Sequence, residues 1–186
     1  MSPLFDETTG SLLKAIHFSA DKHRDQRRKN AIHSPYINHP IEVTQWLWDV
    51  GGIRDSTTLI SAVLHDTLED TQTTKEEITL NFGDMVLAVV LEVTDDKSLP
   101  KLVRKKLQIE HAPNMSFHAK LIKLADKSCN LSDLILSPPS LWNLERKKNY
   151  LRWTEEVVAG LRGTNAALEN KYDEILQNGK LIFEIN

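Results

Sequence analysis

The chain has 186 residues, 40% of them hydrophobic, and a formal net charge of −3 at pH 7; it suits one domain with a substantial core, and it lacks the charge that would attract nucleic acid or anionic membranes in general. The single cysteine, Cys129, excludes an internal disulfide framework and a cysteine-rich zinc site. Because the N-terminus has no signal-peptide pattern and no apolar run reaches membrane-spanning length, we expect a soluble cytoplasmic protein.

Nearly every segment has the apolar spacing and the start and stop residues of a helix. The first expected helix starts at Leu12 and becomes basic at Arg24, Arg27, Arg28 and Lys29, and the second has Pro40 in its first turn and stops at Gly51. The third is capped by Asp55 or Ser56 and runs through residues 62–70, the fourth has a capping box at Thr74 and ends near Gly83, and the fifth covers residues 85–93. A sixth helix starts at Pro100, a seventh runs from Ser116 and stops before Pro138, an eighth runs from Trp142 to Gly163, and a last covers residues 165–177.

Two segments could be extended instead of helical. The valine-rich residues 85–93 could form a strand, but their apolar spacing favours a helix. Residues 181–185 at the C-terminus could form a short extended tail. With no repeat, no low-complexity tract and no linker, residues 1–186 are expected to be one all-α domain, a helical bundle.

The third predicted helix starts apolar and ends in a cluster of polar side chains. On one helix, His65 would share a face with Glu69, and Asp66 with Asp70, because residues four apart are neighbours. Carboxylates at this spacing repel each other, and the dipole near a helix C-terminus is unfavourable to them. A divalent cation would offset both effects.

Two more residues extend this cluster in the chain. His39 precedes Pro40, and Asp126 follows an apolar run in KLIKLAD, just as the His-Asp pair does. Two imidazoles and two carboxylates suit Mn²⁺, Fe²⁺ or Zn²⁺ with positions open for water and substrate, which is a catalytic type of site. Taken singly, each feature has a simpler interpretation: an exposed acidic helix end, a turn histidine at 39, or a surface aspartate at 126.

The short sequence segments around these residues, taken in their order along the chain, resemble those of a known protein family. His39, His65-Asp66 and Asp126 are similar to the signature of HD-domain metal-dependent phosphohydrolases. The segments QRRK (26–29), PYINHP (35–40), VLHDTLED (63–70), EVTDDKSLPKL (92–102) and KLADKSCNLSDL (123–134) together resemble the hydrolase domain of RelA/SpoT-type proteins. The likeness is greatest to the stand-alone small alarmone hydrolases of the metazoan SpoT type, and it spans residues 12–168.

This resemblance implies a Mn²⁺-dependent hydrolase that removes pyrophosphate from the ribose 3′ position of ppGpp or pppGpp. His39, His65, Asp66 and Asp126 would then be the metal ligands. Glu69 and Asp70 match the acidic pair beside the metal, where a carboxylate can orient water or take its proton. Which of the two transfers the proton stays open.

Substrate contacts are also implied by the resemblance. The matching positions are Arg28, Lys29, Lys101, Asn130, Arg146 and Tyr150. Of these, Arg28 would stack its guanidinium on the base. The loop over residues 30–34 and the pair Ser128-Cys129 depart from the family pattern, so guanine and adenine alarmones both remain open. Trp142 and Trp153 are interpreted as core or interface aromatics, and Cys129 as a small buried residue.

Two other functions are weighed against this one. The first is a different HD-family nucleotide phosphohydrolase acting on the ribose phosphates of other nucleotides, which would lack the QRRK and TDDKSLPK segments. The second is a non-catalytic nucleotide sensor, which would have a degenerate site. The expected partner is a small nucleotide, with no nucleic acid and no membrane; the oligomeric state is not predicted.

Overall fold

The computed structural model describes residues 4–30 and 32–185, with side chains from Thr8 onward. The helices are α1 (Leu4–Lys22), α2 (Asn38–Asp49), α3 (Ser56–Leu64), α4 (Thr67–Asp70), α5 (Lys75–Phe82), α6 (Asp84–Val93), α7 (Lys101–His111), the 3₁₀ turn η1 (Ala112–Asn114), α8 (Phe117–Leu136), α9 (Leu144–Ala159) and α10 (Ala166–Ile182). Within the described residues there is no β-strand, only an isolated bridge between Arg27 and Pro35. The all-α prediction is confirmed, including the helix that was favoured over a strand for residues 85–93.

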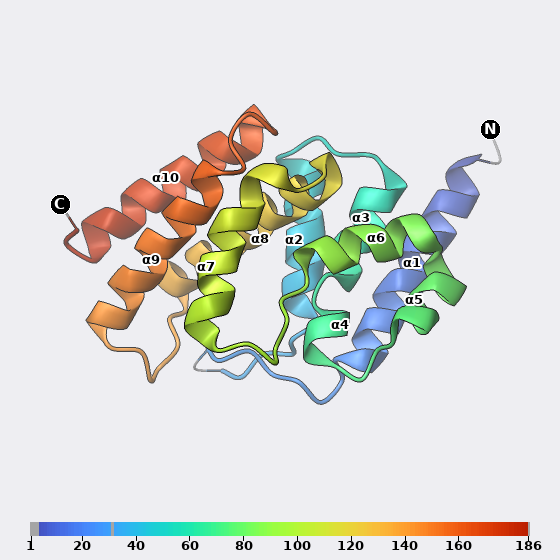
Figure 1. The fold of residues 1–186 in the computed structure, drawn as a ribbon, viewed down its shortest axis with the longest axis horizontal. Coiled ribbons are helices and arrows are strands. Elements are labelled where there is room, and N and C mark those ends of the chain that lie inside the picture. The colour runs from blue at the N-terminus through green and yellow to red at the C-terminus, as the bar shows by residue number, and fades with distance from the viewer. Residues whose placement is uncertain (1–3, 31, 186) are drawn as a thin grey trace.

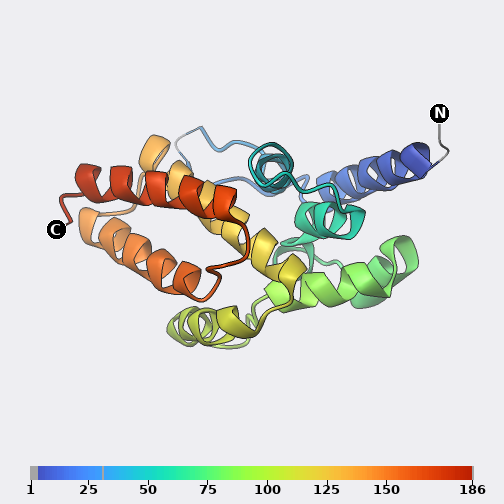
Figure 2. The same ribbon diagram turned by 90° about the horizontal axis from the view of Figure 1, so that it is seen from above.

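Helix α8 is the centre of the molecule. It contacts α2, α3 and α6 on one side and α9 and α10 on the other, so that α9 and α10 form one end of the molecule while α1, α5 and α6 form the other (Figures 1 and 2). Buried leucines of α8, such as Leu121, Leu124 and Leu131, lie in the larger apolar cluster. A smaller cluster joins α1, α3, α5 and α6, and Leu12 packs against both clusters.

Predicted caps begin three of the helices. Asp55 accepts a hydrogen bond from the Thr58 amide at 2.7 Å and caps α3. Thr74 and Glu77 form the reciprocal capping box of α5, and Ser116 accepts from the Ala119 amide to cap α8. These caps bind amide groups that have no partner inside their own helix. Because each cap and its amide lie close together in the chain, the sequence alone predicted these three helix starts correctly.

The basic segment after α1 is not helical, contrary to the prediction. Helix α1 ends at Lys22, and the Gln26 amide then donates to the His23 carbonyl at 2.9 Å in a turn. The Arg28 amide donates to Ser34 at 2.9 Å, so residues 24–29 fold back as one arm of a loop. Of the loop residues that depart from the family pattern, Ala31 lies outside the described residues.

The third helix is also interrupted, where one continuous helix was predicted. Helix α3 ends at Leu64, and the four-residue α4 begins at Thr67. The His65 ring bonds the Ala62 carbonyl through Nδ1 at 2.7 Å, and the Thr67 hydroxyl donates to the Leu64 carbonyl at 2.7 Å. Side chains thus bind carbonyls near the break, and the polar cluster does not lie on one straight helix.

The C-terminal elements differ from the prediction in their bounds. Helix α9 starts at Leu144, after Trp142, and ends at Ala159, before the left-handed Gly163 (φ 84°). Helix α10 continues to Ile182, so the predicted extended tail over residues 181–185 is wrong. Phe183 is buried in the larger cluster, and this apolar contact favours a continued helix over an extended segment.

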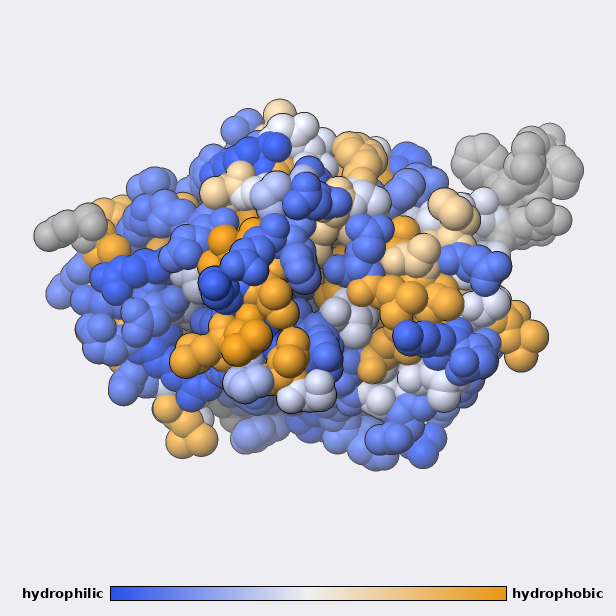
Figure 3. Space-filling view, viewed as in Figure 1, coloured by the Kyte–Doolittle hydropathy of each residue, from blue (hydrophilic) through white to orange (hydrophobic). Residues whose placement is uncertain are grey.

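Helix α7 lies on the surface, and none of its residues is fully buried. Apolar surface gathers over this part of the molecule in the space-filling view (Figure 3), and Leu102 and Val103 are among the exposed side chains of α7. The helix contacts α9. Among the described residues, no helix combines the length and apolar character needed to cross a membrane.

Candidate metal centre and active site

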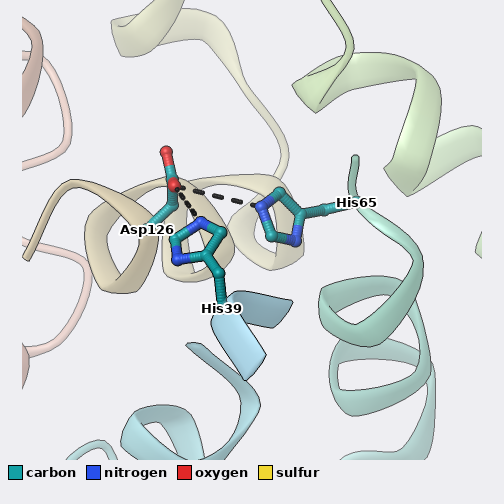
Figure 4. Close-up of side chains that lie close together, drawn as sticks. All are labelled: His39, His65 and Asp126. Atoms are coloured by element: carbon teal, nitrogen blue, oxygen red, sulfur yellow. Dashed lines mark hydrogen bonds and ion pairs between the residues drawn. The ribbon is translucent and has the colours of Figure 1, made fainter. Parts of the chain in front are cut away.

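Two imidazoles and one carboxylate meet at the centre of the fold. His39 comes from the first turn of α2, His65 from the break after α3, and Asp126 from the middle of α8. Asp126 Oδ1 lies 3.1 Å from His39 Nε2 and 3.9 Å from His65 Nε2 (Figure 4). One possible ligand atom from each residue falls within 4.8 Å of the others, and all three residues are buried. The geometry could hold a metal ion.

Asp66 lies at the edge of this cluster. Its Oδ2 is 3.2 Å from His65 Nε2 and 4.0 Å from His39 Nε2. The same oxygen accepts a hydrogen bond from the Tyr36 hydroxyl at 2.7 Å. Asp66 is therefore beside the three-residue group, and Tyr36 holds its carboxylate.

The ring nitrogens of His65 are arranged to bind a cation. Because the Ala62 carbonyl can only accept, His65 Nδ1 carries the proton of that bond, and Nε2 of the neutral ring keeps its lone pair. Nε2 has no hydrogen-bond partner although it is buried. A buried polar atom without a partner costs free energy, and coordination of a metal would satisfy it. A carbonyl that orients a ligating imidazole is the usual arrangement around such ions.

The electrostatics show the same need for positive charge. Burial acts to raise the pKa of Asp66 and of Asp126, but His65 next to the first and Lys127 next to the second hold both pKa values below their usual range. Burial lowers the pKa of His39. Burial opposes a charge on His65 too, yet Asp66 and Asp126 raise its pKa to about 9. Two ionised carboxylates are thus buried side by side and need neighbouring positive charge, and a divalent cation would supply it while leaving His65 neutral.

Glu69 is positioned by the segment that follows α6. Its Oε2 accepts a hydrogen bond from the Asp95 amide at 3.0 Å, and its Oε1 lies 3.7 Å from the Arg104 guanidinium. Burial raises the pKa of Glu69, and the nearby carboxylate of Asp95 adds to the effect. A carboxyl group with a raised pKa in such a place is suited to accept and return a proton.

Asp70 has a different environment. Its Oδ1 accepts a hydrogen bond from the Lys97 ammonium group, and its Oδ2 accepts one from the Gln26 amide nitrogen at 3.0 Å. Glu69 is thus bound by a backbone amide, and Asp70 by a cation and a side-chain amide. The acidic pair predicted from the sequence is one unit in the chain but has two separate sets of partners.

Four of the six predicted substrate positions line one cavity of about 390 Å³. These are Arg28, Lys29, Asn130 and Tyr150. Arg28 donates to Asn130 Oδ1 at 3.2 Å and pairs with Asp133. Its guanidinium lies 5.7 Å from the centre of the Tyr36 ring. Asn130 in turn donates to Asp126, so the cavity is connected by hydrogen bonds to the metal-binding cluster.

The remaining two positions, Lys101 and Arg146, line a second cavity of about 500 Å³. Lys105 lines it as well, and its ammonium nitrogen is 4.3 Å from the centre of the Trp153 ring. Burial lowers the pKa of Lys105 to about 8, and the neighbouring cations, Lys101 first, lower it further. Trp142 and Tyr150 line both cavities, which therefore adjoin each other.

Several residues of this region were not singled out from the sequence. Tyr36 binds Asp66, Gln26 binds Asp70, and Lys127 donates to Asp126 at 2.9 Å. No local pattern marks them, because their partners are distant in the chain or their side chains are buried. The only sequence signal was their presence in the quoted segments.

Of the three residues that the sequence assigned to the core or an interface, the two tryptophans line cavities and the cysteine lies in the core. Trp142 and Trp153 line cavities rather than only packing in the core. Arg146 lies over the Trp142 ring at 4.3 Å. Cys129 is fully buried in the larger apolar cluster, as predicted, and it does not line either cavity.

Comparison with known proteins gives consistent matches. Residues 15–161 match the family described as HD domain. The guanosine-3′,5′-bis(diphosphate) 3′-pyrophosphohydrolase MESH1 of Xenopus tropicalis is 53% identical over 167 residues, covering 90% of this chain and 93% of that protein. The protein of the same name from Homo sapiens is 54% identical over 158 residues, covering 85% and 88%. A solved structure described as a metazoan ortholog of SpoT that hydrolyses ppGpp and plays a role in starvation responses has a TM-score of 0.88 and 48% identity, covering 90% and 94%.

Proposed function

The chain belongs to the HD-domain family and to its guanosine-3′,5′-bis(diphosphate) 3′-pyrophosphohydrolases, and on this basis we propose that it hydrolyses the 3′-pyrophosphate of ppGpp and pppGpp. The products are pyrophosphate and GDP or GTP. The observation that carries the proposal is the convergence of His39, His65 and Asp126 beside a pair of cation-lined cavities.

We propose that a divalent cation, Mn²⁺ in the first place, is held by His39, His65, Asp66 and Asp126. Support comes from the unpartnered Nε2 of His65 and from the two buried carboxylates with depressed pKa values. Such an ion would supply Lewis-acid chemistry, acidifying water and stabilising charge on phosphate oxygens. The mixed nitrogen and oxygen donors also suit Fe²⁺ or Zn²⁺, so the choice of metal is part of the proposal.

The acidic pair of this chain is proposed to handle the proton. Water adds to the phosphorus bonded to the ribose 3′ oxygen and gives up one proton to the acidic pair. The bond between that phosphorus and the 3′ oxygen breaks, and the same proton is returned to the departing oxygen, which leaves as a hydroxyl. Glu69, whose pKa is raised by burial, is suited to take the proton of the water. Asp70, bound by Lys97 and Gln26, is suited to orient that water as a hydrogen-bond acceptor.

The two cavities are proposed to bind the nucleotide. Arg28 and Asn130 contact each other in the first cavity, where a planar guanidinium can stack on a purine base. Lys101, Arg146 and Lys105 in the second cavity provide charge for the phosphate groups, with Lys29 at the side of the first. Adenine and guanine alarmones both fit this chemistry.

Product analysis tests the proposal. Purified enzyme is incubated with ppGpp and with ppApp, with Mn²⁺ and after chelation, and pyrophosphate and nucleoside diphosphate are quantified. We expect equal amounts of the two products, only with the ion, and strong loss in Glu69→Gln and Asp70→Asn. A panel of ordinary nucleoside phosphates is run in parallel. Faster turnover of that panel would assign the chain to another type of HD-family phosphohydrolase, and tight binding without turnover would make it a sensor.

We also propose that residues 1–186 act as one domain, because Leu12 packs against both apolar clusters. Limited proteolysis would test this: a single protected species supports one domain, and two stable fragments would contradict it. The cytoplasmic location stays a prediction.

A further inference from the structure

A chain of hydrogen bonds reaches Asp70 from the interior of the molecule. His23, directly after α1, is 1% exposed. Its Nδ1 lies 2.6 Å from Oε1 of Gln26, and Nε2 of Gln26 donates to Asp70 Oδ2 at 3.0 Å. The His23 ring also stacks on Tyr36, with ring centres 4.9 Å apart.

The direction of each bond in this chain is determined. The Asp70 carboxylate only accepts, so Gln26 must turn its nitrogen toward Asp70 and its oxygen toward His23. His23 Nδ1 must then be the protonated nitrogen of the ring. If Gln26 turned its amide over, its oxygen would face a carboxylate oxygen. The Asp70 carboxylate thus fixes which way the Gln26 amide faces, and the Nδ1–H of His23 holds the amide in that orientation from the other side.

A purely structural role explains His23 poorly. Its Nε2 is buried without a hydrogen-bond partner, and an unpartnered buried nitrogen costs free energy that an apolar ring would avoid. Among the described contacts, the one hydrogen bond of the ring goes to Gln26. A phenylalanine could fill the same space and keep the stacking on Tyr36, but it could not orient the amide.

We propose that His23 and Gln26 are positioning residues that set the orientation of the Asp70 carboxylate for the hydrolytic step. This inference rests on the proposed function. Lys97 binds the other oxygen of Asp70, so the two partners together restrict rotation of the carboxylate. His23 does not line the substrate cavity, whereas Gln26 does, and His23 is therefore the cleaner residue to change.

The first test is His23→Phe. We expect kcat to fall about tenfold, as for the loss of a partner that orients an active-site group, while KM stays within about twofold because the substrate cavity is unchanged. His17→Phe is the matched control, since His17 is exposed on α1 and should keep wild-type kinetics. If His23→Phe hydrolyses ppGpp at the wild-type rate, the inference is wrong.

The second test asks whether His23 acts through Gln26. In a double-mutant cycle, His23→Phe added to Gln26→Ala should cause no further loss of kcat, because the amide is already gone. Melting temperatures are measured for the same four proteins. A structural role for His23 would instead make the two losses of kcat multiply, which would overturn the inference.

A third readout does not depend on turnover. In the NMR spectrum of the labelled protein, the Gln26 side-chain amide signals should shift in both His23→Phe and Asp70→Asn but stay in place in His17→Phe. Unchanged signals in the first two variants would contradict the inference. If the wild-type protein releases no pyrophosphate, the proposed function fails, and these signals alone decide whether the chain of contacts exists in solution.

Discussion

At the scale of single residues, the neighbours of each histidine determine which ring nitrogen points into the proposed metal site. His65 is oriented by the Ala62 carbonyl, which leaves its second nitrogen facing Asp66 and Asp126. His39 approaches Asp126 from α2 at 3.1 Å. The two rings thus reach one carboxylate from two elements, and removal of either ring should open the site.

The first prediction concerns His65→Ala. We expect Mn²⁺ affinity to fall by more than the roughly 10–100-fold that the loss of an outer partner costs, because a direct donor is removed. Equilibrium dialysis with the metal alone measures this, with His17→Ala as the exposed control. Stoichiometric, tight binding by His65→Ala would contradict the proposed metal site.

The second prediction concerns the pH dependence of KM. Burial and the neighbouring cations lower the pKa of Lys105 to about 8. Below that pH the amine is charged and attracts phosphate, and as the pH rises through about 8 it loses its proton. We therefore expect KM for ppGpp to rise above pH 8. Lys105→Arg keeps its charge, so its KM should rise less over the same range; identical profiles would exclude Lys105 from binding.

At the scale of elements, the structure shows which boundaries a sequence can predict. The caps at Asp55, Thr74 and Ser116 were found because a cap and its amide lie within three residues of each other. The break at Leu64 was missed because it depends on bonds from the His65 and Thr67 side chains to carbonyls, which compete with a helix of good apolar spacing.

In the candidate site, too, some features could be predicted from the sequence and others could not. The sequence located His39, His65 and Asp126, and the structure brings them together; their roles as ligands stay a proposal. The contacts of Gln26 and Tyr36 could not be predicted, because each joins segments at least 30 positions apart. Tertiary packing, rather than local pattern, decides such contacts.

The third prediction tests the cap of α3, the helix that leads into His65. Asp55→Ala removes the bond to the Thr58 amide and should cost about 1 kcal/mol of unfolding free energy. For a chain of this size, that lowers Tm by about 2–4 °C. Asp55→Asn keeps an acceptor and should stay near the wild-type value. Calorimetry measures both, and equal losses would show that the cap is not what stabilises the helix.

At the scale of the whole molecule, the proposed metal site joins the two ends. Histidines from α2 and from the end of α3 meet a carboxylate from α8, and α8 carries the contacts to α9 and α10. An ion bound at this junction would hold together the parts of the fold on either side of it. Ligand binding of this kind stabilises only the folded state.

The fourth prediction follows from that linkage. Free Mn²⁺ at 100 times its Kd should add about 2.7 kcal/mol to the unfolding free energy, and this corresponds to a rise in Tm of roughly 5–10 °C for a protein of this size. Chelation should reverse the shift. His65→Ala should show no shift under the same conditions, and an equal shift in that variant would place the stabilising ion elsewhere.

The separation of His39 and Asp126 by 87 positions along the chain has a consequence during synthesis. While a ribosome is making the first half of α8, the nascent polypeptide already contains both imidazoles but not the aspartate that they meet. If Asp126 is a ligand, as proposed, the metal site therefore cannot be complete until the last third of the chain is being synthesised.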